Sequence, residues 1–355
     1  MLGNRKLIVD TFCEVYDLLR PIADAEFWDF GTVVIEPGAV YLISRKEFNT
    51  HVERIRQIAE QDIATIIFSN PHEGSWTMIG QCDRLKITDL VKQNKIVLVG
   101  GGDMDPTYPN LMYDSFLPKP LDYAENVQAQ TDYHAAWSNQ RPYKFLFLNG
   151  RGRPHRKALL ARLNALLDQC IWTNLDSAAG TVQVLPTNYE FSFYQGRQSV
   201  ADTGYVKYDL FNGDWGEIYL KSAPYQDTYF SLITETVFEY PYSFRTEKIA
   251  KPLMIGHPFI VASNQGFYRD LRDLGFRTFN NLIDESFDAI DDNDQRLERI
   301  ALEVEWLCEQ DLAKFADEAY NVCKYNQQHL AEIAPKIRRE FPQRFEKFIN
   351  ERSRV

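Results

Sequence analysis

The chain alternates short apolar runs with amphipathic helical stretches, and this alternation constrains its fold more than any other feature of the sequence. In the first part, several runs have the length and the β-branched content of strands. The expected strands are 6–12, 63–70 and 95–102, and the expected helix is 46–62. Strands that alternate with helices predict a parallel α/β sheet, with ligand-facing loops at the carboxyl ends of its strands.

The alternation restarts after a polar stretch, roughly 105–142, that breaks the pattern. Lys144–Leu148 is expected to be a strand, and His155–Asp168 a helix with leucines at helical spacing. Further strands are expected at 229–236, 257–263 and 276–279, with helices at 246–254 and 267–275. From Asp294 onward the sequence is nearly all helical, with an apolar stripe on one side. The second half therefore predicts another β/α unit.

A chain of 355 residues suits two domains better than one. We expect an N-terminal α/β domain over residues 1–140, a C-terminal α/β domain over 141–320 and a helical segment over 321–355. Two Rossmann-like domains of this kind commonly bind ligands in the cleft between them, at the carboxyl ends of the strands.

Composition narrows the function classes. The net charge of −11 argues against a protein that coats nucleic acid through its phosphates. The 5 cysteines are scattered and lack metal-ligand spacing, which is typical of reduced thiols in a cytoplasmic protein. No apolar run approaches the roughly 20 residues that span a bilayer, and the N-terminus lacks the pattern of a signal peptide. We therefore expect a cytoplasmic protein without a membrane partner.

The clearest cluster of positive charge is the stretch Asn149–Arg156, where a predicted strand ends and a predicted helix begins. It contains Arg151, Arg153 and Arg156. A helix start favours acidic residues, so arginines there suggest a bound anion, and guanidinium groups match phosphate oxygens. The alternative is a solvated basic turn that pairs with the excess acidic residues of the protein.

A second cluster, Thr246-Glu247-Lys248, precedes an apolar run. Thr246 suits the N-cap and Glu247 the first turn of a helix, and Pro252 is expected to interrupt or kink a long helix. Neither preference explains Lys248 at the same helix start. A Glu in a cleft suits ribose or sugar hydroxyls and a Lys suits a diphosphate, so this cluster fits either a capped helix or part of a binding site.

The segment 230–263 resembles the donor site of the α-1,3-fucosyltransferases and related GT-B glycosyltransferases, and also uncharacterised phage-type glycosyltransferase-like proteins. In that family a strand ends in an acid, a Thr/Ser-Glu-Lys follows after a spacer, and a helix, a Gly and another strand complete the segment. Here Glu235 stands for the strand-end acid. The resemblance implies that Glu247 and Lys248 contact a nucleoside-diphosphate sugar and that Arg151 or Arg153 contacts its diphosphate.

The resemblance covers about a tenth of the chain and departs from the family pattern at two positions. Thr236 stands where Asn is usual, and His257 follows the Gly. The identity of the sugar is therefore not implied, and the segment says nothing about the acceptor.

A rival motif, Asp103-Met104-Asp105, follows the strand expected at 95–102. It matches the DxD of metal-dependent GT-A glycosyltransferases, whose carboxylates hold a divalent ion against the diphosphate. The alternative is a glycine-rich turn closed by Asp and Pro106. Because the basic cluster lies in the second β/α half, we favour the metal-independent arrangement, with no metal site and no cofactor beyond the nucleotide sugar.

Transfer to an acceptor hydroxyl with inversion needs a base. Glu73, with His72 beside it, lies in a glycine-closed loop after the strand expected at 63–70, and Asp103 and Asp105 are the other candidates. Each is otherwise a solvated loop residue. Trp76 nearby either stacks on a sugar or packs against the protein.

The expected function is a glycosyltransferase that moves a sugar from a nucleoside-diphosphate sugar to an acceptor hydroxyl of a glycan, a protein or modified DNA. The domain at 1–140 is expected to present the acceptor, and the domain at 141–320 to bind the donor. One alternative is a phage-type enzyme that glycosylates hydroxymethylated bases in DNA. The C-terminal segment 336–355, which is richer in basic than in acidic residues, favours it weakly, and the net charge opposes it. The other is a non-catalytic module that binds a nucleotide sugar.

Overall fold

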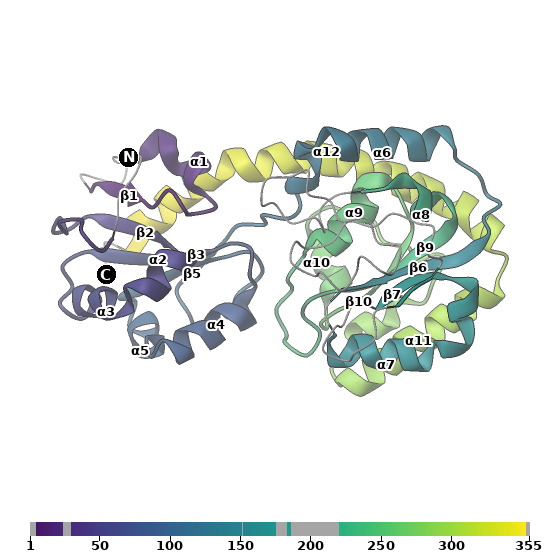
Figure 1. Ribbon diagram of the computed structural model, residues 1–355, viewed down its shortest axis with the longest axis horizontal. Helices are drawn as coiled ribbons and strands as arrows, with labels where there is room; N and C mark the ends of the chain where they lie inside the picture. The colour runs from purple at the N-terminus through teal and green to yellow at the C-terminus, as the bar shows by residue number, and fades with distance from the viewer. Residues whose placement is uncertain (1–4, 24–29, 151, 175–182, 186–219, 353–355) are drawn as a thin grey trace. The chain divides into compact units, whose positions relative to one another are not determined.

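The computed structural model describes residues 5–23, 30–150, 152–174, 183–185 and 220–352. They form two compact α/β units (Figure 1). Unit 1 comprises residues 1–118, 242–244 and 333–355, and unit 2 comprises 119–241 and 245–332. The units separate at 118/119, whereas the sequence placed the first boundary at 140/141, because the helix that follows residue 123 belongs to unit 2.

Unit 1 is built on a five-stranded, fully parallel sheet in the order β1-β2-β3-β4-β5. The strands are β1 (Leu7–Val9), β2 (Val40–Ser44), β3 (Thr65–Asn70), β4 (Ile96–Gly100) and β5 (Asn110–Met112). The helices before β5 are α1 (Tyr16–Leu19), η1 (Arg20–Ile22), α2 (Arg45–Thr50), α3 (Val52–Glu60), α4 (Ser75–Arg84) and α5 (Thr88–Lys92).

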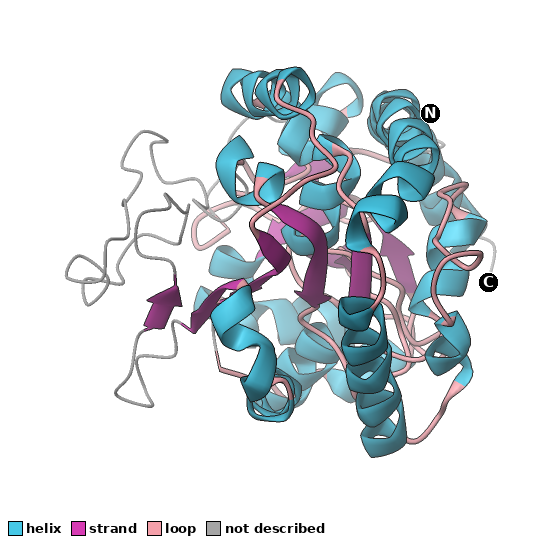
Figure 2. Cartoon of the chain, turned by 90° about the vertical axis from the view of Figure 1, so that its right-hand side faces the viewer, coloured by secondary structure: helices cyan, strands magenta, loops and turns pink. Residues whose placement is uncertain are grey.

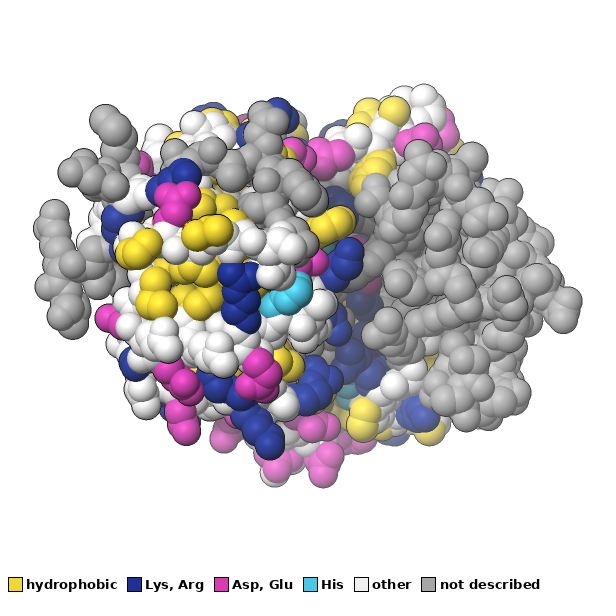
Figure 3. Space-filling view, turned by 60° about the vertical axis from the view of Figure 1, so that its left-hand side comes forward, with side chains coloured by type: hydrophobic (Ala, Val, Ile, Leu, Met, Phe, Trp, Pro, Cys, Tyr) yellow, Lys and Arg dark blue, Asp and Glu magenta, His cyan; other side chains and the backbone are white. Residues whose placement is uncertain are grey.

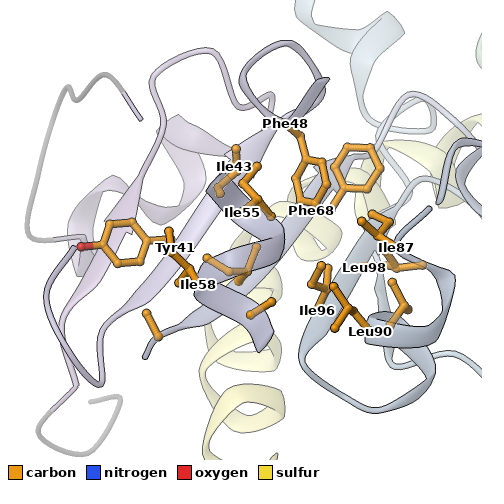
Figure 4. Close-up of a cluster of buried hydrophobic side chains, with 14 of the residues drawn as sticks. Tyr41, Ile43, Phe48, Ile55, Ile58, Phe68, Ile87, Leu90, Ile96 and Leu98 are labelled. Atoms are coloured by element: carbon orange, nitrogen blue, oxygen red, sulfur yellow. The ribbon is translucent and has the colours of Figure 1, made fainter. Parts of the chain in front are cut away.

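Side chains of this sheet alternate between two cores, one on each face. Tyr41, Ile43 and Phe68 point to the face covered by α2–α5, where Phe48 and Phe68 lie with ring centroids 4.3 Å apart (Figure 4). Their neighbours along the strands point to the other face, which packs against α1 and the end of the C-terminal helix. Burial on both faces explains why these strands read as continuous apolar runs.

Unit 2 contains a second five-stranded sheet in the order β10-β9-β6-β7-β8, parallel except at the edge strand β8. The strands are β6 (Tyr143–Asn149), β7 (Ile171–Asn174), β8 (Gln183–Leu185), β9 (Thr228–Thr234) and β10 (Phe259–Ala262). Helices enclose the sheet on both sides (Figure 2).

The helical elements of unit 2 fall into groups that pack together. Helices α6, α8 and α9 form one group, and α7 and α11 contact each other (Figure 1). Their bounds are η2 (Lys119–Asp122), α6 (Ala124–Ala135), α7 (Pro154–Arg162), η3 (Asn164–Gln169), α8 (Ser222–Gln226), α9 (Glu247–Ile255), α10 (Phe267–Asp273), η7 (Glu285–Ala289) and α11 (Asn293–Glu309).

The final helix, α12 (Leu312–Arg352), contributes residues to both units. Its end supplies Phe341, Phe345 and Ile349 to the core of unit 1. The predicted helical segment 321–355 is thus, as far as Arg352, the later part of a longer helix. No helix among the described residues is long and apolar enough to cross a bilayer.

Several sequence expectations are wrong in detail. Residues 276–279 form no strand, and the helix expected at 46–62 is two helices separated at His51. The helix expected over 155–168 ends at Arg162 and continues as the 3-10 helix η3. Pro252 lies inside α9 without ending it, and the helix stops at Gly256, whose φ of 80° is the left-handed conformation that glycine adopts readily.

Candidate functional site

The candidate site lies at the carboxyl edge of the unit 2 sheet, where β6 and β9 end side by side. The two strands are parallel neighbours, so the loops that follow them leave the same edge of the sheet. The loop after β6 leads into α7, and the loop after β9 leads into α9 (Figure 1). The basic stretch Asn149–Arg156 therefore begins at this edge, and hydrogen bonds from Thr246 to Glu235 bring the cluster Thr246–Lys248 to it.

Glu235, the first residue after β9, is fully buried and holds the start of α9. Its Oε1 accepts hydrogen bonds from the backbone N–H groups of Thr246, at 3.1 Å, and Ile249, at 3.3 Å. Its Oε2 accepts from the Thr246 hydroxyl at 2.6 Å and from the Thr236 N–H at 3.1 Å. Burial raises the pKa of the Glu235 carboxyl, and Lys248 and the bonds from Thr246 oppose this rise.

These four donors occupy both oxygens of Glu235. The sequence predicted that Glu235 contacts the sugar donor directly, and that contact stays a prediction. The hydrogen bonds of its carboxylate indicate a positioning role. Two of the N–H groups at the start of α9 are satisfied by this carboxylate, and the side chain of the N-cap residue, Thr246, accepts from the Lys248 N–H at 3.3 Å. Most of the helix start is therefore not open to an external anion.

Lys248 and Glu247 form an ion pair at this helix start. The Lys248 ammonium donates to Glu247 Oε1, and it also lies 3.2 Å from the Thr246 hydroxyl. Burial alone raises the pKa of Glu247, but the Lys248 ammonium outweighs it and the pKa lies below its ordinary value. The side chain of Lys248 is 23% exposed and that of Glu247 11%, so Lys248 is the more accessible of the two.

The start of α7 reaches the same strand end from the other side. His155 and Arg156 are both buried. The His155 ring donates from Nε2 to the Glu235 carbonyl at 3.0 Å, since a carbonyl oxygen only accepts. Arg156 Nη2 donates to the carbonyls of Thr234, at 2.9 Å, and Glu235, at 3.2 Å. The main chain at the end of β9 thus fixes α7, and the Glu235 side chain fixes α9.

His155 is neutral in this setting. Burial and the neighbouring Arg156 charge lower its pKa to about 3, so the ring carries its single proton on Nε2. The ring also stacks on Phe238, with centroids 5.0 Å apart and planes 12° from parallel. The positive charge at this helix start therefore comes from the arginines and from the helix itself.

The two helix starts differ in how they are capped. The N-cap of α7 is Arg153, which is partly exposed, and among the described residues no side chain caps this helix. No acidic residue lies in its first turn. The start of α7 therefore combines the positive end of the helix dipole with two arginines, which favours a bound anion.

Asn149, the last residue of β6, has a polar atom without a partner in the part of the chain that the structure describes. It is 2% exposed; its Oδ1 accepts from the Thr234 hydroxyl at 2.9 Å, and its Nδ2 has no hydrogen bond. Reversing the amide leaves the oxygen unpaired instead, because a hydroxyl both donates and accepts. A water molecule or a ligand has to complete this amide.

In unit 1, the candidate base Glu73 lies in the loop after β3, with Oε1 3.6 Å from Arg45 Nη1. Its side chain is 27% exposed. Asp103 donates its backbone N–H to the Ser243 carbonyl at 2.8 Å, and its side chain is partly exposed. Both carboxylates follow strands of the unit 1 sheet, as the sequence predicted.

The Asp103–Asp105 motif has the geometry of a packed turn. Asp105 Oδ1 accepts from the N–H of Thr107 at 2.9 Å and from its hydroxyl at 2.7 Å, which closes the turn locally. A Cβ on Gly101 would lie 1.8 Å from the Pro71 carbonyl oxygen, so this glycine is needed for close packing. Among the described residues no group of 3 or more His, Cys, Asp and Glu side chains is arranged to hold a metal ion.

The structure brings together Arg153, Arg156, Glu235, Glu247 and Lys248 at one sheet edge, whereas Glu73 and Asp103 belong to the other unit. Arg151 lies outside the described residues. His257, where the sequence departs from the family pattern, is a buried residue that accepts from the Ser231 hydroxyl at 2.9 Å and donates to the Thr228 carbonyl at 2.7 Å.

Sequence reasoning missed the roles of Asn149 and His155. Both stood inside the basic stretch, and the available signal was a polar residue that ends an otherwise apolar strand. Their partners on β9 lie some 80 residues away in the chain, 85 for Asn149–Thr234 and 80 for His155–Glu235, so spacing alone does not reveal them. No family model, curated protein or solved structure matches this chain.

Proposed function

We propose that the protein is a glycosyltransferase of the GT-B type that binds a nucleoside-diphosphate sugar at the carboxyl edge of the unit 2 sheet and needs no metal ion. The observation that carries the proposal is the double attachment at Glu235. Its carbonyl accepts from His155 and Arg156 of α7, and its carboxylate accepts from Thr246 and Ile249 of α9. The starts of α7 and α9 are thereby held at one strand end.

The diphosphate belongs at the start of α7 in this proposal. Arg153 and the positive end of the helix dipole face it, Arg156 adds buried positive charge, and Lys248 supplies an ammonium from the neighbouring helix. Cations placed where the leaving group develops charge stabilise the transition state. The ionised Glu247 suits hydroxyl groups of the sugar or the ribose, because a carboxylate accepts hydrogen bonds.

The transfer step breaks the bond between the anomeric carbon and the diphosphate oxygen, which leaves with the bonding electrons. An acceptor hydroxyl forms the new bond to the anomeric carbon and loses its proton to a base. Glu73 is the proposed base and Asp103 the second candidate, since each follows a strand of the unit 1 sheet and is partly exposed. We assign Glu235 to positioning and not to chemistry.

A thermal-shift panel of nucleotide sugars, measured in the presence of a metal chelator, tests this proposal. A ligand that binds only the folded state raises the melting temperature, so we expect at least one nucleotide sugar and its nucleoside diphosphate to do so. Slow hydrolysis of the stabilising donor, without added acceptor, is expected of an enzyme. A panel that shifts nothing contradicts the proposal, and binding without hydrolysis or transfer indicates a non-catalytic module.

A further inference from the structure

We infer that the carboxyl edge of the unit 1 sheet binds a neutral carbohydrate, with the exposed rings of Trp76 and Phe12 as its stacking surfaces. The inference rests on the proposed function in one respect, because it names the acceptor class of that reaction. The binding surface itself is argued from unit 1 alone.

Two aromatic side chains stand out at this edge. Trp76 is 54% exposed and begins the helix that follows the β3 loop, and Phe12 is 51% exposed in the turn that follows β1. Aromatic rings of this size are normally buried. A ring exposed beside hydrogen-bonding groups suits a ligand that has both an apolar face and polar edges, as a sugar ring has.

Charged side chains at the start of α2 lie between the turn that carries Phe12 and the loop that precedes Trp76. The Lys46 ammonium sits 3.9 Å above the Phe12 ring, and Arg45 Nη1 lies 3.6 Å from Glu73 Oε1. Trp76 follows Glu73 by three residues. The surface therefore runs from Phe12 over Lys46 and Arg45 to Glu73 and ends near Trp76.

The backbone beneath each ring is fixed. Asp10, which is fully buried, accepts from the Phe12 N–H at 2.9 Å and from the Ser44 N–H at 3.2 Å. The Glu73 N–H donates to the Asn70 carbonyl at 3.1 Å, and the Glu73 carbonyl accepts from the Gly101 N–H at 2.9 Å. Phe12 is therefore presented on a turn held by a buried carboxylate, and Trp76 on the first turn of α4 directly after a fixed loop, which lowers the cost of ordering the rings on binding.

A buried amide at the same edge also lacks a partner. Asn70 ends β3 and is 2% exposed, and its Nδ2 makes no hydrogen bond within the part of the chain that the structure describes. It lies directly before the loop that carries Glu73 and leads into α4, where Trp76 lies. A water-mediated contact from this amide to a bound hydroxyl would satisfy it.

The charge balance favours a neutral ligand over a polyanion. Arg45 and Lys46 are offset by Glu73 and by Glu14, whose Oε1 lies 3.9 Å from His72 Nδ1. Figure 3 shows that acidic and basic side chains are also interspersed over a wider area of one face, around a patch of hydrophobic side chains. The phosphates of a nucleic-acid backbone would be repelled by these carboxylates. Sugar hydroxyls both donate and accept hydrogen bonds, so they can bridge an Arg and a Glu.

The test measures binding of free oligosaccharides (malto-, cello- and chito-oligosaccharides and lactose) by calorimetry, with short single-stranded and duplex DNA as the other probes. We expect at least one oligosaccharide to bind and DNA not to bind at physiological salt. Trp76→Ala should weaken oligosaccharide binding roughly tenfold or more, the size expected for one stacked ring. Phe12→Ala should also weaken it.

The matched control is Trp306→Ala, which removes an exposed tryptophan, 45% exposed, from α11 in unit 2. It should leave oligosaccharide affinity unchanged. Absence of binding by every oligosaccharide, equal affinity of Trp76→Ala and wild type, or DNA binding that depends on Trp76 would overturn the inference.

Nucleotide-sugar thermal shifts, measured on the same variants, separate this inference from the proposed function. If the shifts persist while oligosaccharides fail to bind, only this inference fails. If oligosaccharides bind but no nucleotide does, the proposed function fails and the carbohydrate site stands.

Discussion

At the scale of single residues, Glu235 has the most demanding position in unit 2. A fully buried carboxylate is costly unless hydrogen bonds satisfy it, and here three backbone N–H groups and a hydroxyl do so. The sequence predicted the importance of this residue but not the nature of its role. Its partners are main-chain groups, which the sequence does not display.

Replacing Glu235 with Gln should lower the free energy of unfolding by about 1–3 kcal/mol, because an amide offers one accepting oxygen where the carboxylate offers two and leaves buried donors unpaired. Denaturant unfolding measures the change. Glu298→Gln is the control: that side chain is 52% exposed in an ion pair with Arg162, and its loss should cost at most about 1 kcal/mol. Equal effects of the two substitutions would contradict the positioning role of Glu235.

His155 makes the stability of the protein depend on pH. Its pKa is lowered to about 3 from 6.5, so between these values the unfolded chain binds a proton that the folded chain does not. Stability should therefore fall as the pH drops below about 6.5, by up to about 1.4 kcal/mol per pH unit from this residue.

His155→Gln keeps a donor for the Glu235 carbonyl and removes the titration. Denaturant unfolding at several pH values from 7.5 to about 5 compares the slopes. The variant should lose stability more gradually with falling pH than the wild type, and superimposable slopes would show that His155 is not the buried neutral group described here. Burial also lowers the pKa of His257 to about 3. This residue therefore makes the stability of both proteins fall with pH to some extent.

At the scale of elements, local sequence predicted β1, β3 and β4 of unit 1, β6, β9 and β10 of unit 2, and the starts of α7 and α9. It missed β2 and β7, although each lies between two other strands of its sheet. It failed where contacts between residues far apart in the sequence determine the local structure. Residues 276–279 look like a strand because Phe276 and Phe279 are buried core residues, yet they pair with no strand among the described residues. The glycine-rich loop after β4 looked like a ligand loop, and its geometry is that of close packing.

Gly101→Ala tests this packing explanation. A Cβ there would meet the Pro71 carbonyl oxygen at 1.8 Å, whereas a Cβ on Gly80, inside α4, would meet nothing within 4 Å. Thermal and denaturant unfolding should show Gly101→Ala destabilised by about 2 kcal/mol or more and Gly80→Ala stabilised by about 0.5–1 kcal/mol through helix propensity. A tolerated alanine at position 101 would reopen a ligand-binding role for the loop.

At the scale of the whole molecule, the sequence predicted two parallel α/β halves, and the structure contains two such units. The extent of each unit could not be read from the sequence. Residues 242–244 and the end of α12 belong to unit 1 although they lie far along the chain, because the unit 1 sheet needs Phe341, Phe345 and Ile349 to cover its second face. Such long-range contacts leave only a weak trace in local patterns.

The central claim is that a nucleoside diphosphate binds at the start of α7. Calorimetry with the nucleoside diphosphate selected by the thermal-shift panel tests it most directly, comparing Arg153→Ala with Arg162→Ala. The two arginines carry the same charge at opposite ends of one nine-residue helix, and Arg162 pairs with Glu298 and Glu305. Loss of charge-assisted contacts to phosphate should weaken binding about tenfold or more in Arg153→Ala and leave Arg162→Ala within about twofold of wild type. Equal affinities of the two variants, or no binding by the wild type, would contradict the claim.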